Sequence, residues 1–183
     1  MKSFRNVLIV LITFVSFVLA DESGDFISNI SKQTNIILDG SKNQDQKYLD
    51  YIEKNVDVEW IAKFVLGQEN RKISTEQFEQ FKSVYKDYLL NNYISKIKDY
   101  NNDLKIVKTV DRGNNVFVVS ITAKDKIGTR INVDFRVVKK SHFLITDIVA
   151  EGISFIGSQR TDIVNSIKTM GFDGMLEKMK TKK

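Results

Sequence analysis

Alternation of apolar and polar residues is clearest between residues 129 and 155, and this segment is the centre of the predicted fold. One side of an extended chain there would carry Ile131, Val133, Phe135 and Val137. A period of two is typical of a β-strand with one buried face. After the polar residues 139–142 comes a second β-rich run, residues 143–150. The two runs predict an antiparallel hairpin, after which residues 151–155 leave the sheet edge.

Two more strands are predicted immediately before this hairpin. Residues 104–110 and 116–123 are rich in β-branched side chains, and the turn-forming sequence Asp-Arg-Gly-Asn-Asn separates them. A second turn at residues 125–128 leads into the hairpin. The pattern therefore predicts an antiparallel meander of about four strands.

Helical spacing of apolar residues occurs on both sides of this meander. The expected helices before it span residues 25–39, a short segment after Gln46 with Tyr48, Leu49 and Ile52 inward, residues 57–67 and about 75–98. Those after it span about 156–170 and 173–180. Asp57 is a candidate N-cap, and Ser74 with Gln77 has the spacing of a capping box. The third helix is expected to bury Trp60, Ile61, Phe64 and Val65. Helices and strands kept in separate blocks predict an α+β fold, with the helices packed on one face of a curled antiparallel sheet.

The first 20 residues have the features of a secretory signal peptide. A basic start precedes an apolar run from Val7 to Leu19, and the small residue Ala20 precedes a polar segment. The alternative is an uncleaved N-terminal anchor. We expect residues 1–20 to be a cleaved leader and residues 21–183 to form a single domain. The sequence contains no cysteine, so this domain is expected to fold without a disulfide.

The charge of the chain argues against a nucleic-acid partner. Removing residues 1–20 takes Lys2 and Arg5 from the 28 basic residues and leaves all 23 acidic residues, so the net charge falls from +5 to +3. The basic residues are scattered among acidic ones rather than gathered on one face. The lysine-rich end, residues 178–183, is expected to be a solvated tail.

Candidate catalytic residues are few. The only histidine, His142, lies in a polar turn beside two lysines, and the chain has no cysteine nucleophile, phosphate loop or His/Cys metal spacing. Three carboxylates on or near the hairpin are candidates for an acid–base pair: Asp134, Asp147 and Glu151. The simpler interpretation is that Asp147 pairs with Arg136 across two strands, and the lack of an evident proton-transfer partner favours it.

Four segments match motifs that occur together, in the same order, in one known protein family. Residues 57–67, DVEWIAKFVLG, resemble the family pattern D-F-x-x-x-A-x-x-V-L-G. The segment that starts at Thr75 resembles T-P-E-Q-x-x-x-F but lacks the proline. Residues 133–137 and 147–160 resemble V-D-Y-R-L…D-V-x-V-E-G-V-S-L…x-R, and residues 171–176 resemble G-F-D-G-L-L. These matches keep their order over nearly the whole chain after residue 20. The sequence therefore resembles the MlaC family, the periplasmic phospholipid shuttles of the maintenance-of-lipid-asymmetry pathway, also called toluene-tolerance auxiliary proteins.

The resemblance implies a monomeric, non-enzymatic carrier without a cofactor, whose ligand is a glycerophospholipid. Its partners would be an outer-membrane lipoprotein complex and the substrate-binding ring of an inner-membrane ABC transporter. The acyl tails would lie in an apolar cavity between a twisted sheet and the helices. The residues expected to line it are Trp60, Phe64, Phe81, Tyr85, Tyr88, Leu89, Val133, Phe135, Val137, Ile148, Ile153 and Phe155. Arg136 and Arg160 are candidates for head-group or partner contact.

Two alternatives stay open at this point. A small periplasmic enzyme with an apolar pocket would use Asp147 or Glu151 as acid or base. An adaptor would bind no ligand, and the large apolar residues would then form a close-packed core.

Overall fold

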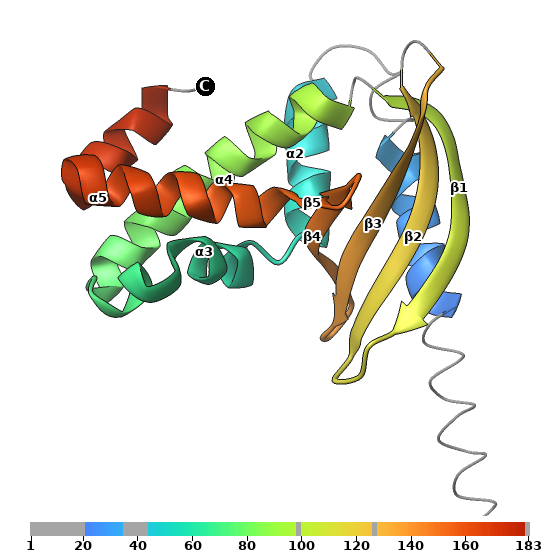
Figure 1. Ribbon diagram of the computed structural model, residues 1–183, viewed down its shortest axis with the longest axis horizontal. Coiled ribbons are helices and arrows are strands. Elements are labelled where there is room, and N and C mark those ends of the chain that lie inside the picture. The colour runs from blue at the N-terminus through green and yellow to red at the C-terminus, as the bar shows by residue number, and fades with distance from the viewer. Residues whose placement is uncertain (1–20, 35–43, 98–99, 126–127, 182–183) are drawn as a thin grey trace, which may run out of the picture.

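The computed structural model describes residues 21–34, 44–97, 100–125 and 128–181 (Figure 1). The predicted leader, residues 1–20, lies outside the described residues. So does the predicted end of the first helix, residues 35–39. In the described part of the chain, no helix combines the length and the apolar character that crossing a bilayer requires.

A single antiparallel sheet is formed by β1 (Tyr100–Asp111), β2 (Val116–Asp125), β3 (Arg130–Lys139), β4 (Phe143–Ala150) and β5 (Ile153–Ser154). The strands lie in chain order, so the sheet is an open meander. The four predicted strands are confirmed, although β1 begins at Tyr100 rather than Leu104. The short β5 was not predicted. It pairs with the last residues of β4 and carries the chain into the next helix.

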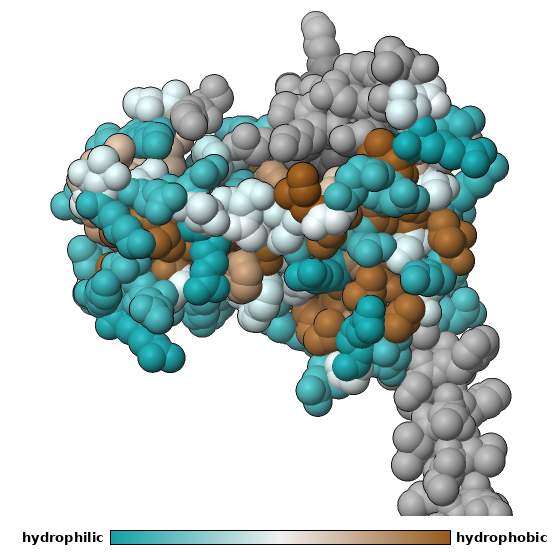
Figure 2. All heavy atoms as spheres, viewed as in Figure 1, coloured by the Kyte–Doolittle hydropathy of each residue, from teal (hydrophilic) through white to brown (hydrophobic). Residues whose placement is uncertain are grey.

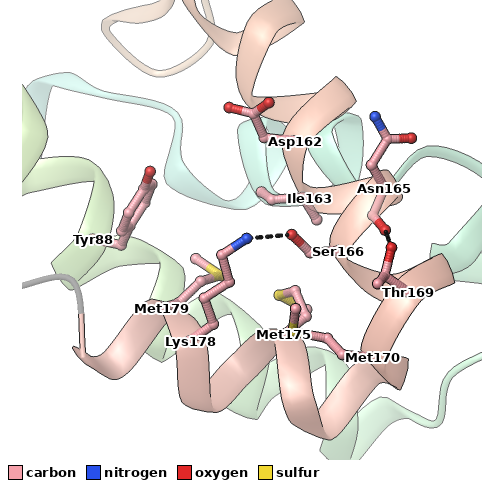
Figure 3. Close-up of a pocket in the computed structure, with 10 residues that line it drawn as sticks. All are labelled: Tyr88, Asp162, Ile163, Asn165, Ser166, Thr169, Met170, Met175, Lys178 and Met179. Atoms are coloured by element: carbon pink, nitrogen blue, oxygen red, sulfur yellow. Dashed lines mark hydrogen bonds between the residues drawn. The ribbon is translucent and has the colours of Figure 1, made fainter.

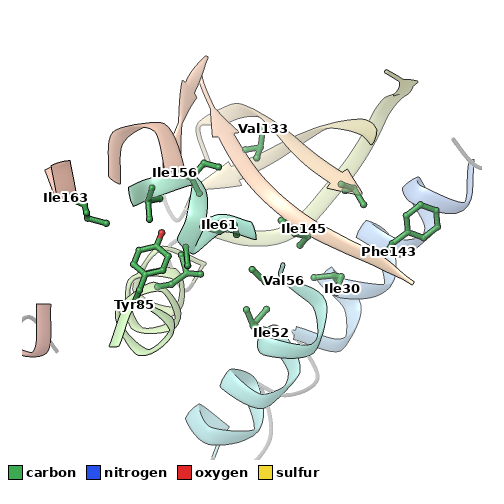
Figure 4. Close-up of a cluster of buried hydrophobic side chains, with 14 of the residues drawn as sticks. Ile30, Ile52, Val56, Ile61, Tyr85, Val133, Phe143, Ile145, Ile156 and Ile163 are labelled. Atoms are coloured by element: carbon green, nitrogen blue, oxygen red, sulfur yellow. The ribbon is translucent and has the colours of Figure 1, made fainter. Parts of the chain in front are cut away.

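The apolar face predicted for β3 packs against helix 21–34. Val133 and Val137 are buried and Phe135 is half-buried. On the same face, the ring centroid of Phe143 lies 5.8 Å from that of Phe117. It also lies 5.8 Å from the ring centroid of Phe26, which belongs to helix 21–34. Helix α2 (Gln44–Asn55) lies beside helix 21–34, and the buried residues Ile30, Ile52, Val56 and Ile145 meet between these helices and the sheet (Figure 4).

The remaining helices form a second layer beyond the β4–β5 edge, here called the helical lobe (Figure 1). The lobe consists of α3 (Val58–Leu66), the short 3₁₀-helix η1 (Gly67–Arg71), α4 (Thr75–Ile97) and α5 (Phe155–Thr181). The predicted capping box at α4 is confirmed. The Ser74 N–H donates to Gln77 Oε1 at 2.9 Å, and the Gln77 N–H donates to Ser74 Oγ at 3.2 Å. Helix α5 is interrupted at Gly171, which has φ 74° and ψ 173°, as expected for two helices separated by a glycine.

The face of α3 that packs inward agrees only in part with the predicted one, because Ile61 and Val65 are buried as expected and Trp60 and Phe64 are not. The structure buries Ile61, Ala62, Val65 and Leu66. Trp60 remains 43% exposed, and Phe64 is half-buried. Glu59 and Lys63 mark one polar side of the helix, but its apolar residues cover most of the remaining circumference, so helical spacing alone does not identify which of them face α4 and α5.

Candidate functional site

The residues predicted to line a lipid site fall into three groups by burial. Buried residues are Phe81, Tyr85, Leu89, Val133 and Val137. Half-buried residues are Phe64, Tyr88, Phe135, Ile148 and Phe155. The other two lie at the surface: Trp60 is 43% exposed and Ile153 is 67% exposed. The buried members belong to one continuous hydrophobic cluster that extends from the sheet into the helical lobe.

The aromatic residues of α4 form a row that faces the other helices of the lobe. The rings of Phe81 and Tyr85 stack with centroids 5.3 Å apart. The ring centroid of Tyr88 lies 6.3 Å from that of Tyr85. The Tyr85 hydroxyl donates to Gln159 Oε1 of α5. Figure 4 shows Tyr85 near Ile61, Ile156 and Ile163. The structure therefore brings the predicted α4 residues together, mainly within the helical lobe.

A second group is built around Arg160. Trp60 stacks on Phe64 with centroids 5.3 Å apart, and the Arg160 guanidinium carbon lies 5.1 Å from the Phe64 ring centroid. Arg160 also lies against Gly67, where a Cβ atom would come within 2.7 Å of Arg160 Nη2. Gly67 has φ 57°, a conformation that favours glycine, and its N–H caps α3 by donating to the carbonyls of Lys63 and Phe64. Gly67 thus both ends α3 and leaves room for the guanidinium.

Asp147 connects the sheet to α5. Its side chain is 1% exposed, and Oδ2 lies 3.3 Å from Arg136 Nη1. The Ser154 hydroxyl donates to the same oxygen at 2.7 Å, and the Ile156 N–H donates to Oδ1 at 3.2 Å. Ser154 Oγ in turn accepts from the Gly157 N–H at 3.0 Å, so both side chains cap the start of α5. The predicted pair between Arg136 and Asp147 is confirmed, and both carboxylate oxygens have partners within the protein.

A bulge in β4 gives Asp147 this orientation. Arg136 pairs with Asp147 and Val137 pairs with Ile145, which leaves Thr146 as the extra residue. Ile145 therefore faces the core, whereas Asp147 lies on the same face as Arg136. The sequence carried no clear signal for this bulge.

Asp57 makes the corresponding connection for α3. Its N–H donates to the carbonyl of Ile145 at 2.9 Å, and its carboxylate accepts from the Trp60 N–H at 3.3 Å. Lys140 Nζ lies 2.6 Å from Asp57 Oδ2, so the turn between β3 and β4 also contacts the start of α3. The capping role of Asp57 was predicted, whereas its contacts with the sheet were not.

A pocket of about 400 Å³ opens between α4 and the two parts of α5 (Figure 3). Its lining includes Ile163, Met170, Met175 and Met179. Lys178 Nζ donates to Ser166 Oγ at 3.1 Å across it. Burial raises the pKa of Tyr88, and the Asp162 carboxylate raises it further. Since one ammonium group and one carboxylate line this pocket, it has no net charge that would select an anion.

Of the residues predicted to line a lipid site, Tyr88 alone contributes to this pocket. Its volume is in the lower part of the range for small-molecule sites, roughly 300–1,000 Å³. It lies inside the helical lobe, away from β3. The cavity predicted between the sheet and the helices is a different feature and stays a prediction.

Comparison with known protein families decides the classification. The family model described as MlaC protein matches residues 21–181. The chain belongs to the MlaC family. The proteins of this family are periplasmic lipid-binding shuttles and not enzymes. The family inferred from the sequence motifs is therefore confirmed, as is the prediction that the protein is not an enzyme.

A comparison with solved structures supports the fold. The structure of a phospholipid-binding protein from Ralstonia solanacearum, solved in complex with a phospholipid, matches with a TM-score of 0.70. The match covers 88% of this chain and 93% of that chain at 14% sequence identity. At this identity the comparison shows a shared fold, and the predicted α+β architecture is confirmed.

Proposed function

We propose that this protein binds one glycerophospholipid between its sheet and its helices and carries it through the periplasm. The family match over residues 21–181 is the observation that carries this proposal. The phospholipid in the Ralstonia solanacearum structure supports it, because that protein has the same fold. The proposed partners are an outer-membrane lipoprotein complex and the ring of an inner-membrane ABC transporter.

The energetics of acyl chains favour a carrier of this kind. Each methylene group buried away from water contributes about 0.8 kcal/mol, so exposing two long acyl chains would cost on the order of 20 kcal/mol. Transfer from a bilayer to an equally apolar site changes the free energy little. The carrier then exchanges lipid in both directions, and the partners set the direction of net transport.

The proposed tail site consists of the twelve residues predicted to line it, of which only Trp60 and Phe64 belong to α3. Burial of Val133 and Val137 on the inner face of the sheet supports this assignment. Of the two candidate head-group contacts, Arg136 already pairs with Asp147. The guanidinium of Arg160 lies on the Phe64 ring and, within the described residues, within 4 Å of no carboxylate. Arg160 is therefore the stronger candidate for a phosphate or partner contact.

The proposal includes export and a monomeric domain. Residues 1–20 would be removed as a signal peptide, which agrees with the start of the family match at residue 21. Residues 21–183 would then act as one lipid-binding domain. Since the family is periplasmic, no contact with nucleic acid is expected.

Purified protein is expected to carry a glycerophospholipid at about one molecule per chain. Exposure of the tails to water is so unfavourable that a lipid acquired in the cell should persist through purification. Native mass spectrometry measures the mass of the complex, and organic extraction followed by mass spectrometry identifies the lipid. A folded sample that contains no extractable lipid, and that takes up none from vesicles, would contradict the proposal.

Reversing the charge with Arg160→Glu is expected to slow lipid transfer between vesicles, or docking to a partner, several-fold. The melting temperature should stay close to that of the wild type, because Arg160 is only half-buried and its cation–π contact with Phe64 contributes about 0.5–2 kcal/mol. Lys168→Glu, an equal charge change at an exposed position of the same helix, serves as the control. Parallel loss of transfer and of thermal stability in Arg160→Glu would assign Arg160 a structural role instead.

A further inference from the structure

Two buried hydroxyl groups belong to the first two helices that the structure describes. Thr34, in helix 21–34, is 4% exposed, and Tyr48, in α2, is fully buried. Neither Thr34 Oγ1 nor the Tyr48 hydroxyl makes a hydrogen bond to any residue in the described part of the chain. Most buried polar side-chain atoms in folded proteins do have a partner, so two such hydroxyls require an explanation.

The positions of the two residues place their side chains in the same layer. Thr34 is one helical turn beyond Ile30, and Tyr48 is one helical turn before Ile52, so each shares a helix face with that isoleucine. Ile30 and Ile52 lie close together beside Ile145 of the sheet (Figure 4). The two helices run in opposite directions (Figure 1). Thr34 and Tyr48 therefore lie on the same side of the isoleucine contact.

The two groups are neutral hydrogen-bond donors. Burial raises the pKa of Tyr48, so its hydroxyl stays protonated at neutral pH. A threonine hydroxyl is also uncharged and donates one hydrogen bond. The chemistry of this layer therefore suits an uncharged acceptor. A phosphate would suit it poorly, because moving its charge out of water is unfavourable unless a cation accompanies it.

We propose that Thr34 and Tyr48 donate hydrogen bonds to the ester carbonyl oxygens of the bound glycerophospholipid. This inference rests on the proposed function and adds the part of the ligand that the two residues recognise. Ester carbonyls are uncharged acceptors, and each is bonded directly to an acyl chain. They enter the interior together with the tails, whereas the phosphate stays outside. The two hydroxyls thereby select lipids with ester-linked chains.

The test compares two lipids with the same head group and chain length, a diacyl phosphatidylglycerol and its dialkyl ether analogue, which lacks the carbonyls. Delipidated wild-type protein is expected to bind the diacyl lipid roughly five- to tenfold more tightly for each hydrogen bond made. Tyr48→Phe and Thr34→Val should each reduce this preference by that factor while leaving affinity for the ether lipid unchanged. The melting temperature of the delipidated variants should be unchanged or higher, because the hydroxyl they remove has no partner in the protein.

Tyr51→Phe is the matched control, since it makes the same chemical change on the same helix at a half-buried position. It should retain the ester preference of the wild type. Equal affinity of wild type and Tyr48→Phe for the diacyl lipid would overturn the inference, as would equal loss of both lipids. A lower melting temperature of delipidated Tyr48→Phe would overturn it too, by showing an internal partner. If the wild type binds neither lipid, the proposed function itself fails, and this outcome is distinct from the others.

Discussion

Replacing Asp147 with alanine is expected to lower the free energy of unfolding by about 3–5 kcal/mol, because it removes two hydrogen bonds to a buried carboxylate, each of which contributes about 1.5–3 kcal/mol. The variant loses the acceptor for the Ser154 hydroxyl and for the Ile156 N–H, as well as the partner of Arg136. The start of α5 would then have no carboxylate cap from the sheet. Urea unfolding of delipidated protein measures the change, and delipidation keeps the effect separate from that of the ligand.

The controls separate the cap from the ion pair. Arg136→Ala is expected to cost less than Asp147→Ala, because the Arg136 side chain is 51% exposed and the Asp147 carboxylate keeps its hydrogen bonds from Ser154 and Ile156. Asp134→Ala removes a carboxylate from the neighbouring strand that is only half-buried. It should therefore change stability by less than about 0.5 kcal/mol. A loss of less than about 1 kcal/mol in Asp147→Ala would show that Asp147 does not anchor α5.

The elements that sequence predicted well are those set by local patterns. Alternation along β3 and helical spacing along α4 each reflect a single interface, and the capping box at Ser74 is complete within four residues of chain. The bulge at Thr146 depends on contacts with β3 and with the start of α5, which are distant along the chain, so no local sequence pattern predicts it. The face of α3 was predicted only in part, with Ile61 and Val65 buried as expected, and the reason is related. That helix is apolar on several sides, and its inward side is chosen by contacts with α5, which is distant in sequence.

The candidate site shows a similar division. The motif residues that identified the family hold the helical lobe on the sheet. Asp57 and Asp147 each join a helix start to β4, and Gly67 leaves room for Arg160. Such contacts need particular atoms at particular positions, so they appear as motifs. Acyl chains need only an apolar surface, which many side chains provide. The motifs therefore revealed the family more directly than they revealed the lining of the site.

The hydroxyls of Thr34 and Tyr48 illustrate what sequence could not supply. Both residues lie in predicted helices at positions that point inward, where threonine and tyrosine are ordinary. Only the structure shows that their polar atoms are buried without a partner among the described residues. The spacing of residues along a chain does not show whether a buried hydroxyl group has a hydrogen-bond partner.

Replacing Val133 with tryptophan is expected to reduce bound lipid from about one molecule per chain to nearly none. Val133 lies on the inner face of β3, where its side chain is proposed to contact the acyl chains. If a lipid site is present there, the larger ring occupies space that the lipid otherwise fills, and the delipidated protein loses little stability. In a close-packed core, the same change would force strain of about 1–3 kcal/mol. Lipid content by extraction and urea unfolding of delipidated protein together distinguish the two cases.

Val65→Trp is the matched control, because Val65 is a fully buried valine within the helical lobe. It should lose stability through overpacking, and lipid content per folded chain should stay near that of the wild type. The two variants are thus expected to have opposite effects. A Val133→Trp protein that keeps its lipid but unfolds at lower urea would behave like the control. Val133 would then belong to the close-packed core, and the binding site of the acyl chains would have to be placed elsewhere in the protein.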